Sequence, residues 1–219
     1  MARKPADQSV HRDDIILAAA GVLQRNGYEA TTMKDIAAAV NLTAASLYHH
    51  FRNKDALLLA VLEAGLAIII ARIEPIVHSS QPPADKLRAM IKSHVTGLAG
   101  NTAVGAAMVY EIKALLHVAP PKANASEADR AAYTDFVARR NNFFRQRDHF
   151  EDLFRCVIQE GIERGEFRPV DAAIFAKTML GAHNWVGVWY RPHGRLTGDQ
   201  IADMMADTFL NALKTSVKG

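Results

Sequence analysis

One short segment carries side chains whose types and spacing suit contact with a nucleic-acid duplex. These residues recur at the three- and four-residue steps of one helix face, and they are Ala44, Ala45, Tyr48 and His49. The small side chains of Ala44 and Ala45 would let a helix approach base edges, and their methyl groups could meet the methyl group of thymine. The phenol of Tyr48 and the imidazole of His49 are long enough to reach backbone phosphates.

A short helix with a well-marked start must lie just ahead of this face. Thr32 precedes apolar residues at helical spacing, and its hydroxyl can accept an orphan backbone N–H of a helix over residues 34–41. Asp35 follows three residues later, which suits a capping box and the positive end of the helix dipole. Asn41 tolerates the left-handed conformation that ends a helix. The pattern therefore predicts a short helix followed at once by a tight turn.

A second short helix, over residues 45–51, would present the DNA-facing side chains outward. Thr43 can cap it, and Leu47 and Phe51 lie four residues apart on the opposite, inward face. Lys54 begins the next helix, where its ammonium group could pair with a backbone phosphate. The residues expected to contact DNA are Thr32, Thr43, Ala44, Ala45, Ser46, Tyr48, His49 and Lys54.

The complete string is more specific than a bare pair of helices, which is common in proteins that bind no DNA. Residues 12–58 resemble the DNA-binding domain of the TetR family of bacterial transcriptional repressors, through RDDIILAAAGVLQRNGYEATT, MKDIAAAVNLTAASLYHHF and RNKDALLLAVL. Gly27 and Tyr28 stand where relatives place a Gly–Tyr or Gly–Phe pair. Asn41 replaces the Gly of many relatives, and Ala45 replaces a larger residue or Gly, so the operator sequence stays open.

Helical periodicity dominates the rest of the chain, with breaks at clusters of Pro and Gly. The resemblance implies an all-α fold, with a three-helix DNA-binding domain and then a larger helical domain for ligand binding and dimerisation. We place the first domain at residues 1–54, with a flexible tail over 1–10, and the second at 55–219. Helices are predicted near residues 12–27, 34–41, 45–51, 54–80, 84–99, 103–117, 127–164, 170–190 and 198–216.

The helix after the DNA-binding segment is the covalent route between the two domains. Its stretch Leu57 to Ile73 is apolar on nearly all sides, which predicts that it is buried. The resemblance implies that this helix shifts when a small-molecule effector binds and so releases a homodimer from a pseudo-palindromic DNA operator.

An aromatic stripe interrupted by two arginines runs along residues 127–164. Arg140 and Arg147 share the helix face of Phe143 and Phe150, and Phe144 widens that face. A buried guanidinium needs an anionic partner. Either Glu111 supplies it inside the protein, or an anionic ligand does, such as the phosphate or carboxylate of an acyl-CoA. The residues expected to hold a ligand are Arg140, Phe143, Phe144, Arg147, Phe150 and Trp185.

The last 55 residues or so bear on the ligand. The string NWVGVWYRP and the segment after it are similar to those of TetR-family regulators of lipid and steroid catabolism. That resemblance implies a response to CoA thioesters. Two alternatives stay open: a repressor of a multidrug efflux system that responds to hydrophobic drugs, and a DNA-binding protein without an effector.

The last two predicted helices carry apolar stripes that suit a dimer interface. Gly181 would let a partner helix approach closely, and two helices from each protomer would form a four-helix bundle. The alternative is that both stripes pack inside their own subunit. The residues expected at the interface are Ile174, Thr178, Gly181, Trp185, Ile201, Met205 and Phe209.

Composition fits a soluble protein of a reducing compartment. The chain has 219 residues, a net charge of +3 and one cysteine, Cys156, so it can form no internal disulfide. The excess of cations lies modestly toward the first quarter of the chain, as a DNA-binding segment would require. The N-terminus lacks a signal peptide, and the longest apolar run, Ala64 to Ala71, is far shorter than a membrane span. We expect a cytoplasmic protein with no membrane partner.

Catalytic and metal-binding motifs do not emerge from the sequence. There is no G-x-S-x-G, and Gly100 to Gly105 has phosphate-loop spacing without the required Lys and Ser or Thr. The histidines are scattered and lack H-E-x-x-H spacing; His183 in particular suits a hydrogen-bonded core residue. We therefore expect no enzyme activity, no metal and no cofactor, although an enzyme that also carries a helix-turn-helix stays an alternative.

Overall fold

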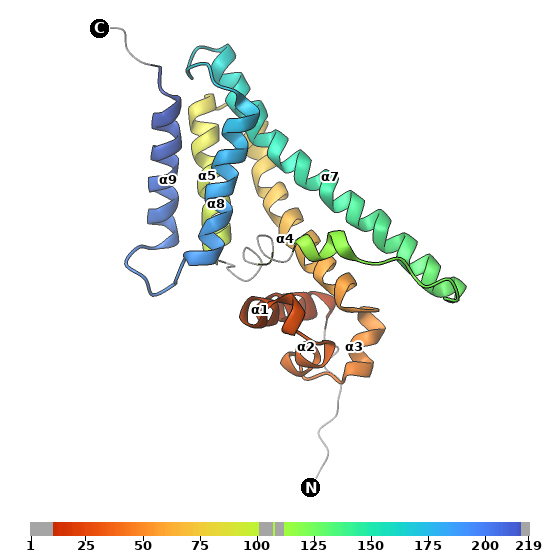
Figure 1. The fold of residues 1–219 in the computed structure, drawn as a ribbon. Coiled ribbons are helices and arrows are strands. Elements are labelled where there is room, and N and C mark those ends of the chain that lie inside the picture. Colours follow the sequence, from red (N-terminus) through yellow and green to blue (C-terminus); the bar gives the residue numbers. More distant parts are fainter. Residues whose placement is uncertain (1–10, 101–106, 108–111, 216–219) are drawn as a thin grey trace.

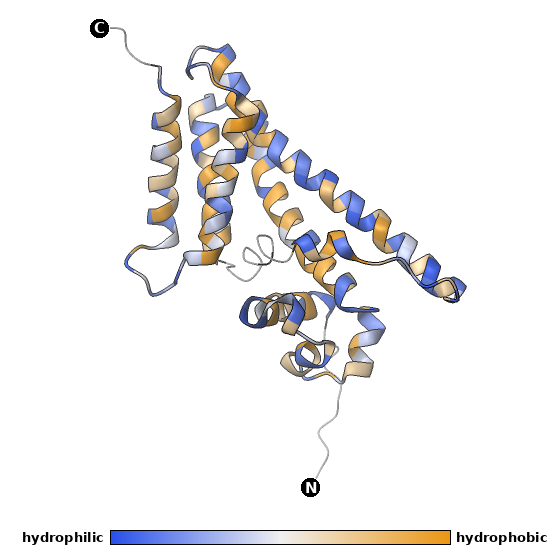
Figure 2. Cartoon of the chain, in the orientation of Figure 1, coloured by the Kyte–Doolittle hydropathy of each residue, from blue (hydrophilic) through white to orange (hydrophobic). Residues whose placement is uncertain are grey.

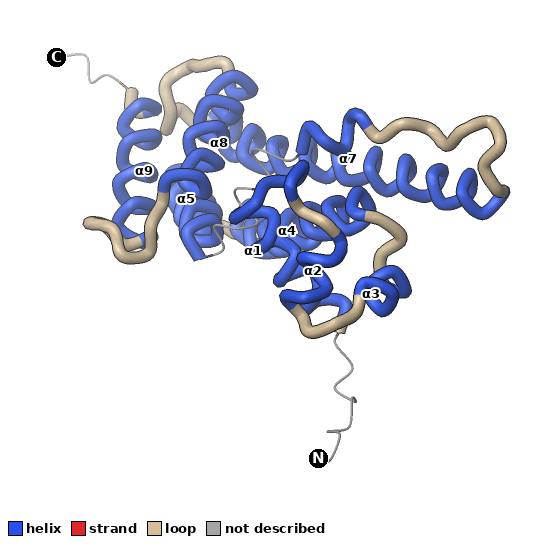
Figure 3. The backbone as a smooth tube through the Cα atoms, turned by 60° about the horizontal axis from the view of Figure 1, so that its bottom comes forward, coloured by secondary structure: helices blue, strands red, loops and turns tan. Residues whose placement is uncertain are grey.

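The computed structural model describes residues 11–100, 107 and 112–215, and helices make up nearly all of its regular structure (Figures 1 and 3). This confirms the all-α prediction. The tail over residues 1–10 and the suggested partner Glu111 lie outside the described residues. The described helices are α1 Arg12–Ala30, α2 Met33–Ala39, α3 Ala44–His50, α4 Lys54–Val77, α5 Pro83–Gly100, the 3-10 helix η1 Ile112–His117, α7 Glu127–Glu163, α8 Ala172–Trp189 and α9 Gly198–Leu213.

Local side-chain contacts set the boundaries of the first three helices. Gly27 breaks α1 with a φ of 74°, and the Thr31 hydroxyl donates to its carbonyl oxygen at 2.7 Å. The predicted capping box of α2 is present, because the Asp35 N–H donates to Thr32 Oγ1 and the Thr32 N–H donates to Asp35 Oδ2. Asn41 adopts the predicted left-handed conformation, with a φ of 56°. The helix and turn that precede α3 therefore form as the residue types require.

The N-terminal domain is a small bundle with its own core. α1, α2 and α3 pack around buried aliphatic side chains and against the first turns of α4 (Figure 1). Leu57 and Val61 of α4 are fully buried in this core, so the first turns of the connecting helix are part of the packing of the N-terminal domain.

α4 leaves that bundle and enters the C-terminal domain (Figure 1). Leu58, Leu62 and Leu66 are buried in the larger core, but Ile68 is 55% exposed. The prediction that Leu57 to Ile73 is buried on all sides is therefore wrong for one face. The apolar face beyond Leu66 borders a cavity instead of a neighbouring helix. By length and composition α4 could cross a membrane, yet half of its most apolar window is buried here, as expected of a core helix.

α5, α8 and α9 lie side by side in the C-terminal domain (Figure 1). α7 is the longest helix: one end packs against α4, α5 and α8, and the other returns toward the N-terminal domain. Figure 2 shows hydrophilic residues along much of α7 and hydrophobic ones along α4. α7 therefore connects the C-terminal core to the surroundings of α3.

Three helices, α4, α8 and α9, are shorter than predicted. α4 ends at Val77, where Ser79 donates to the Ile76 carbonyl at 2.7 Å. α8 begins only after Asp171, whose carboxylate accepts two backbone N–H groups at 3.0 Å. α9 ends at Leu213, before a bridge between Lys214 and Phe167. In each case a cap or a tertiary contact ends the helix before its periodicity fades.

Candidate DNA-binding surface and ligand cavity

The inner face of α3 packs against the core of the N-terminal domain, and its outer face is exposed to solvent. Thr43 accepts the Ser46 N–H at 3.0 Å, as predicted for the cap. Leu47 is fully buried and Phe51 is 3% exposed, so the inward face is the predicted one. Tyr48 is 53% exposed, and Ala45 and His49 are exposed beside it. The structure thus places the small and the long side chains together on a solvent-facing surface of a short helix.

Lys54 differs from the expectation. Its Nζ donates to the Tyr28 carbonyl oxygen at 2.6 Å and lies 4.1 Å from the centroid of the Tyr28 ring. The ammonium group thereby satisfies carbonyls at the end of α1, where a cation is favourable. The Lys54 ammonium group is therefore occupied within the protein and is not free to contact a DNA phosphate in this geometry. The sequence spacing could not reveal this, because the carbonyls belong to Tyr28 and Glu29, 26 and 25 positions earlier.

Two ion pairs tie α7 to its surroundings: one reaches the end of the N-terminal domain, and the other reaches α4. Arg52, before α4, forms an ion pair with Asp129 and donates to the Ala128 carbonyl at 3.2 Å. Arg139 forms a second ion pair, with Glu63 of α4. The Ser126 hydroxyl and, to a lesser degree, the Arg52 charge lower the pKa of Asp129, which stays ionised at neutral pH. Sequence analysis missed both links, since neither has a local spacing signal.

A surface groove of about 1130 Å³ lies along these links. Its walls carry carboxylates such as Asp55 and Asp135 as well as cations such as Lys113 and Lys122. The mixed charges give it no clear preference for an anion or a cation.

A second cavity, of about 430 Å³, lies inside the C-terminal domain between α4, α5, α7 and α8. Apolar side chains form much of its wall, and the polar groups are few. Its apolar lining residues are Leu66, Ile68, Ile69, Leu98, Phe150 and Leu180, and its polar and charged ones are Arg72, His94, Arg147, Glu151, Lys177 and Asn184. An apolar wall with a few polar groups is the usual composition of a small-molecule site.

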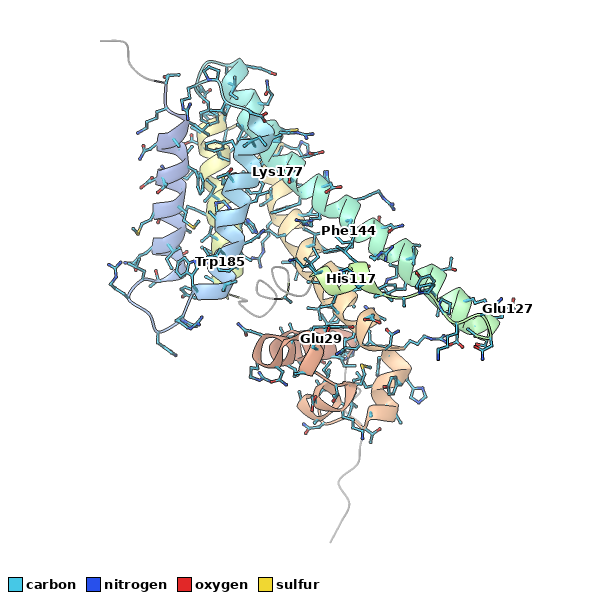
Figure 4. All side chains as sticks on the ribbon, viewed as in Figure 1. Glu29, His117, Glu127, Phe144, Lys177 and Trp185 are labelled. Carbon is cyan, nitrogen blue, oxygen red and sulfur yellow. The ribbon has the colours of Figure 1, made fainter. Side chains whose placement is uncertain are left out.

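The exposed part of this cavity is cationic. Lys177 is paired with Glu151, whereas Arg72 and Arg147 have no ion-pair or hydrogen-bond partner within the described part of the chain. Both arginines are exposed and come from different helices, α4 and α7. Figure 4 places Lys177 on the part of α8 that faces α7. Two guanidinium groups beside an apolar cavity suit an anionic group on a hydrophobic ligand.

Two of the six residues expected to hold a ligand, Arg147 and Phe150, line the cavity. Phe143 is 1% exposed and packs edge to face on Phe144 at 5.4 Å between ring centroids. Arg140 is half-buried and donates to the Leu115 carbonyl of η1 at 3.3 Å. The expectation that Arg140 and Arg147 are both buried was therefore wrong, since Arg140 is half-buried and Arg147 is exposed. α7 is about 55 Å long at 1.5 Å per residue, so one stripe meets several different neighbours along it.

Trp185 also does not lie where a ligand-binding residue was expected. It is 51% exposed near the lower end of α8 (Figure 4) and is not among the residues that line the cavity. Arg72 and His94 were missed; Arg72 had a usable signal, because it is a cation within the otherwise apolar sequence of α4.

A buried pair of histidines adjoins the cavity. His94 of α5 is 5% exposed and His183 of α8 is fully buried, with their Nδ1 atoms 3.4 Å apart. Burial lowers the pKa of His94 to about 4, and burial together with the charge of His94 lowers the pKa of His183 well below 6.5. Both imidazoles are therefore neutral at pH 7. No cluster of metal-ligating side chains occurs among the described residues.

The outer side of α8 exposes large apolar residues. Ile174, Trp185 and Trp189 are 60%, 51% and 46% exposed, and Thr178 and Gly181 continue the same side. No atom lies within 4 Å of a Cβ built on Gly181, which also borders the cavity, so Gly181 lies between the cavity and the outer side of α8.

The α9 part of the expected interface is mostly turned inward. Ile201 is 5% exposed, and Phe209 packs on His183 and Phe175 at 5.5 and 6.0 Å between ring centroids. Met205 is half-buried, and the exposed methionine is its neighbour Met204, at 56%. The stripe at 201, 205 and 209 could have formed a dimer interface or packed within its own subunit. It packs within the subunit, because α5 and α8 cover that side of α9.

Comparison with known proteins gives matches at both ends of the chain. Residues 15–61 match the family model described as "Bacterial regulatory proteins, tetR family", and residues 136–213 match "Tetracyclin repressor-like, C-terminal domain". The HTH-type transcriptional repressor KstR2 of Mycolicibacterium smegmatis is 27% identical over 213 residues, which cover 97% of this chain and 95% of that repressor.

Two solved structures are similar over nearly the full length. The ketosteroid transcriptional regulator KstR2 of Mycobacterium tuberculosis superposes with a TM-score of 0.78 at 23% identity, over 98% of this chain and 100% of that one. AibR, in complex with isovaleryl coenzyme A and operator DNA, superposes with a TM-score of 0.66 at 29% identity, over 90% of this chain and 96% of that one.

Proposed function

This chain belongs to the TetR family of bacterial transcriptional regulators, and we propose that it represses transcription until an acyl-CoA thioester fills the cavity between α4, α5, α7 and α8. Members of this family are DNA-binding regulators and not enzymes. A regulator of bacterial operators acts in the cytoplasm, where the chromosome lies.

The observation that carries the effector class is the pair of arginines beside an apolar cavity. Arg72 and Arg147 lack carboxylate partners among the described residues, so an anion would meet unpaired guanidinium groups. The lining beyond them, which includes Leu66, Ile69 and Leu180, suits a hydrocarbon. An acyl-CoA joins these two chemistries in one molecule, and AibR, which is 29% identical, was solved with such a ligand.

α4 provides the physical route from the cavity to the DNA. Ile68, Ile69 and Arg72 line the cavity, and two to three turns earlier Leu57 and Val61 are buried in the core of the N-terminal domain. A ligand that displaces the cavity end of this rigid helix would reorient α3. Release then requires only that the ligand bind the displaced state more tightly than the DNA-bound state.

A homodimer gives the two α3 helices that a pseudo-palindromic operator requires. The exposed side of α8, with Ile174, Gly181 and Trp185, is the proposed interface, extended by Met204 of α9. The α3 helices would enter major grooves roughly 34 Å apart. Tyr48 and His49 would meet phosphates while Ala44 and Ala45 approach base edges, with Thr32, Thr43 and Ser46 at the ends of the two short helices.

A drug-responsive repressor of an efflux system is the second candidate. Its support is the apolar wall of the cavity, which would also accept a neutral hydrophobic drug. The two arginines make a cationic drug unfavourable, because like charges would meet at short range. An effector-independent protein is less well supported, since a cavity of about 430 Å³ would then have no use.

The test is operator release by matched ligands. An operator is first selected from a random pool of duplexes with the purified protein, and its binding is followed by fluorescence anisotropy. We expect isovaleryl-CoA, decanoyl-CoA or longer thioesters to release the DNA, with no effect of free CoA at the same concentration. Release by hydrophobic drugs but by no thioester would favour the second candidate, and failure to select any duplex would contradict the DNA-binding role.

A further inference from the structure

The paired imidazoles of His94 and His183 constrain each other's protons. A neutral imidazole has one N–H donor and one acceptor nitrogen. The two Nδ1 atoms are 3.4 Å apart, so one must carry the proton and the other must accept it. Aromatic rings enclose the pair, with Phe150 at 5.0 Å from His94 and Phe209 at 5.5 Å from His183 between ring centroids. No carboxylate contacts either imidazole within the described structure.

The second nitrogen of His183 decides between the two arrangements. Among the described residues, His183 Nε2 is the buried side-chain nitrogen or oxygen that has no hydrogen-bond partner. If His94 donated to His183, then Nε2 of His183 would be an orphaned buried N–H donor. Orphaned N–H groups are rarer in proteins than unsatisfied acceptors. The favoured arrangement therefore has His183 donating from Nδ1 and keeping a bare acceptor at Nε2.

This arrangement fixes the proton of His94 on Nε2. His94 lines the cavity, and its Nδ1 is occupied by His183, so Nε2–H is the group that it can offer to a ligand. Low pKa values of both imidazoles keep the pair neutral at pH 7, so the donor is an uncharged one. The surrounding wall is apolar, and Asn184 is the other uncharged polar side chain known to line it.

We propose that His94, held by His183 in the Nε2–H tautomer, donates a hydrogen bond to an uncharged carbonyl oxygen on the apolar body of the effector. This inference rests on the proposed function and narrows its ligand class. His94 is buried whereas Arg72 and Arg147 are exposed, so the carbonyl belongs to the buried part of the ligand and not to its anionic end. The favoured effector is therefore a thioester that carries a ketone within its acyl chain, in addition to the thioester carbonyl, and not one with a plain hydrocarbon chain.

The test compares two thioesters that differ by one ketone oxygen, 9-oxodecanoyl-CoA and decanoyl-CoA. We expect the wild-type protein to bind the oxo compound about tenfold more tightly, the effect of one net hydrogen bond. His94→Leu should bring the ratio of dissociation constants to about one, and His94→Gln, which keeps an N–H donor, should retain most of the preference. Asn184→Leu is the matched control within the same cavity and should leave the ratio unchanged.

The outcomes separate the inference from the proposed function. Equal binding of the two thioesters by the wild type overturns the inference alone, and so does loss of the preference in Asn184→Leu but not in His94→Leu. If neither thioester binds, the proposed effector class fails and the inference with it. Should His94→Leu not fold, ¹⁵N-histidine NMR of the wild type replaces it: a proton on Nδ1 of His94, or no shift of the Nε2–H resonance with 9-oxodecanoyl-CoA, overturns the inference.

Discussion

The guanidinium of Arg52 is ion-paired with the carboxylate of Asp129, 77 residues later in the chain. Arg52 directly follows the helix-turn-helix, and Asp129 lies in the first turn of α7, whose distant part carries Arg147 beside the cavity. The N-terminal domain therefore meets the C-terminal domain twice, through the covalent path of α4 and through this surface contact. A ligand that moves α7 relative to α4 would therefore stretch the Arg52–Asp129 ion pair or shift the N-terminal domain relative to α4.

Asp129→Asn should weaken the coupling between effector and operator while leaving the fold intact. Both side chains are about half exposed, so the pair contributes little to folding. We expect the effector-induced drop in operator affinity to shrink by about two- to fivefold, the range typical of exposed ion pairs. Anisotropy titrations with and without effector measure it. Asp135→Asn changes an acidic residue of α7 that has no ion pair among the described residues, and it is the control. An equal effect there would remove the coupling role.

Tyr48→Ala should weaken binding to every duplex. Tyr48 is 53% exposed on the outer side of α3, where its hydroxyl would contact a phosphate and read no base. We expect roughly a tenfold loss for the selected operator and for an unrelated duplex alike, measured at low salt. A loss confined to the selected operator would instead make Tyr48 a base-reading residue.

Arg147→Ala should raise the concentration of acyl-CoA needed for release about tenfold, because a charge-assisted hydrogen bond is lost, and should spare operator affinity. Arg147 is exposed and has no protein partner among the described residues, so the fold should not suffer. Arg145→Ala, two residues away and outside the cavity lining, is the matched control. Equal release curves for wild type and Arg147→Ala would remove this arginine from the site.

Trp185→Glu should convert the dimer to a monomer. The substitution puts a charge into the proposed apolar interface, at a residue that is 51% exposed in the single subunit. Sedimentation velocity measures the change, and a folded monomer should bind the operator far more weakly. Leu17→Glu on α1, which is 63% exposed, is the control for an added surface charge. A dimer that persists in Trp185→Glu places the interface elsewhere.

Mild acid should destabilise the C-terminal domain. Burial lowers the pKa of His94 from 6.5 to about 4. Between these two pH values the unfolded chain therefore binds a proton at His94 and the folded chain does not. Stability is therefore highest above pH 6.5 and falls as the pH drops toward 4, by about 3 kcal/mol for this residue alone. Urea unfolding between pH 7 and pH 4.5 measures the slope. His94→Leu should flatten it, and an unchanged slope would assign the effect to other groups.

Sequence reasoning reached furthest where contacts are local. Thr32, Asp35 and Thr43 cap helices three residues away, and Asn41 forms its turn alone, so residue type and spacing were sufficient. The same holds for Leu47 and Phe51, because four-residue spacing fixes a shared face.

Tertiary structure decided everything that depends on which neighbour a helix meets. The arginines of α7 show it best: Arg140 meets a carbonyl of η1, while Arg147, two turns on, borders the cavity together with Arg72 of α4. The meeting of His94 with His183, 89 positions apart, had no sequence signal at all. Periodicity defines the faces of a helix, but the packing of distant helices determines which face holds a ligand, which joins a partner and which is buried.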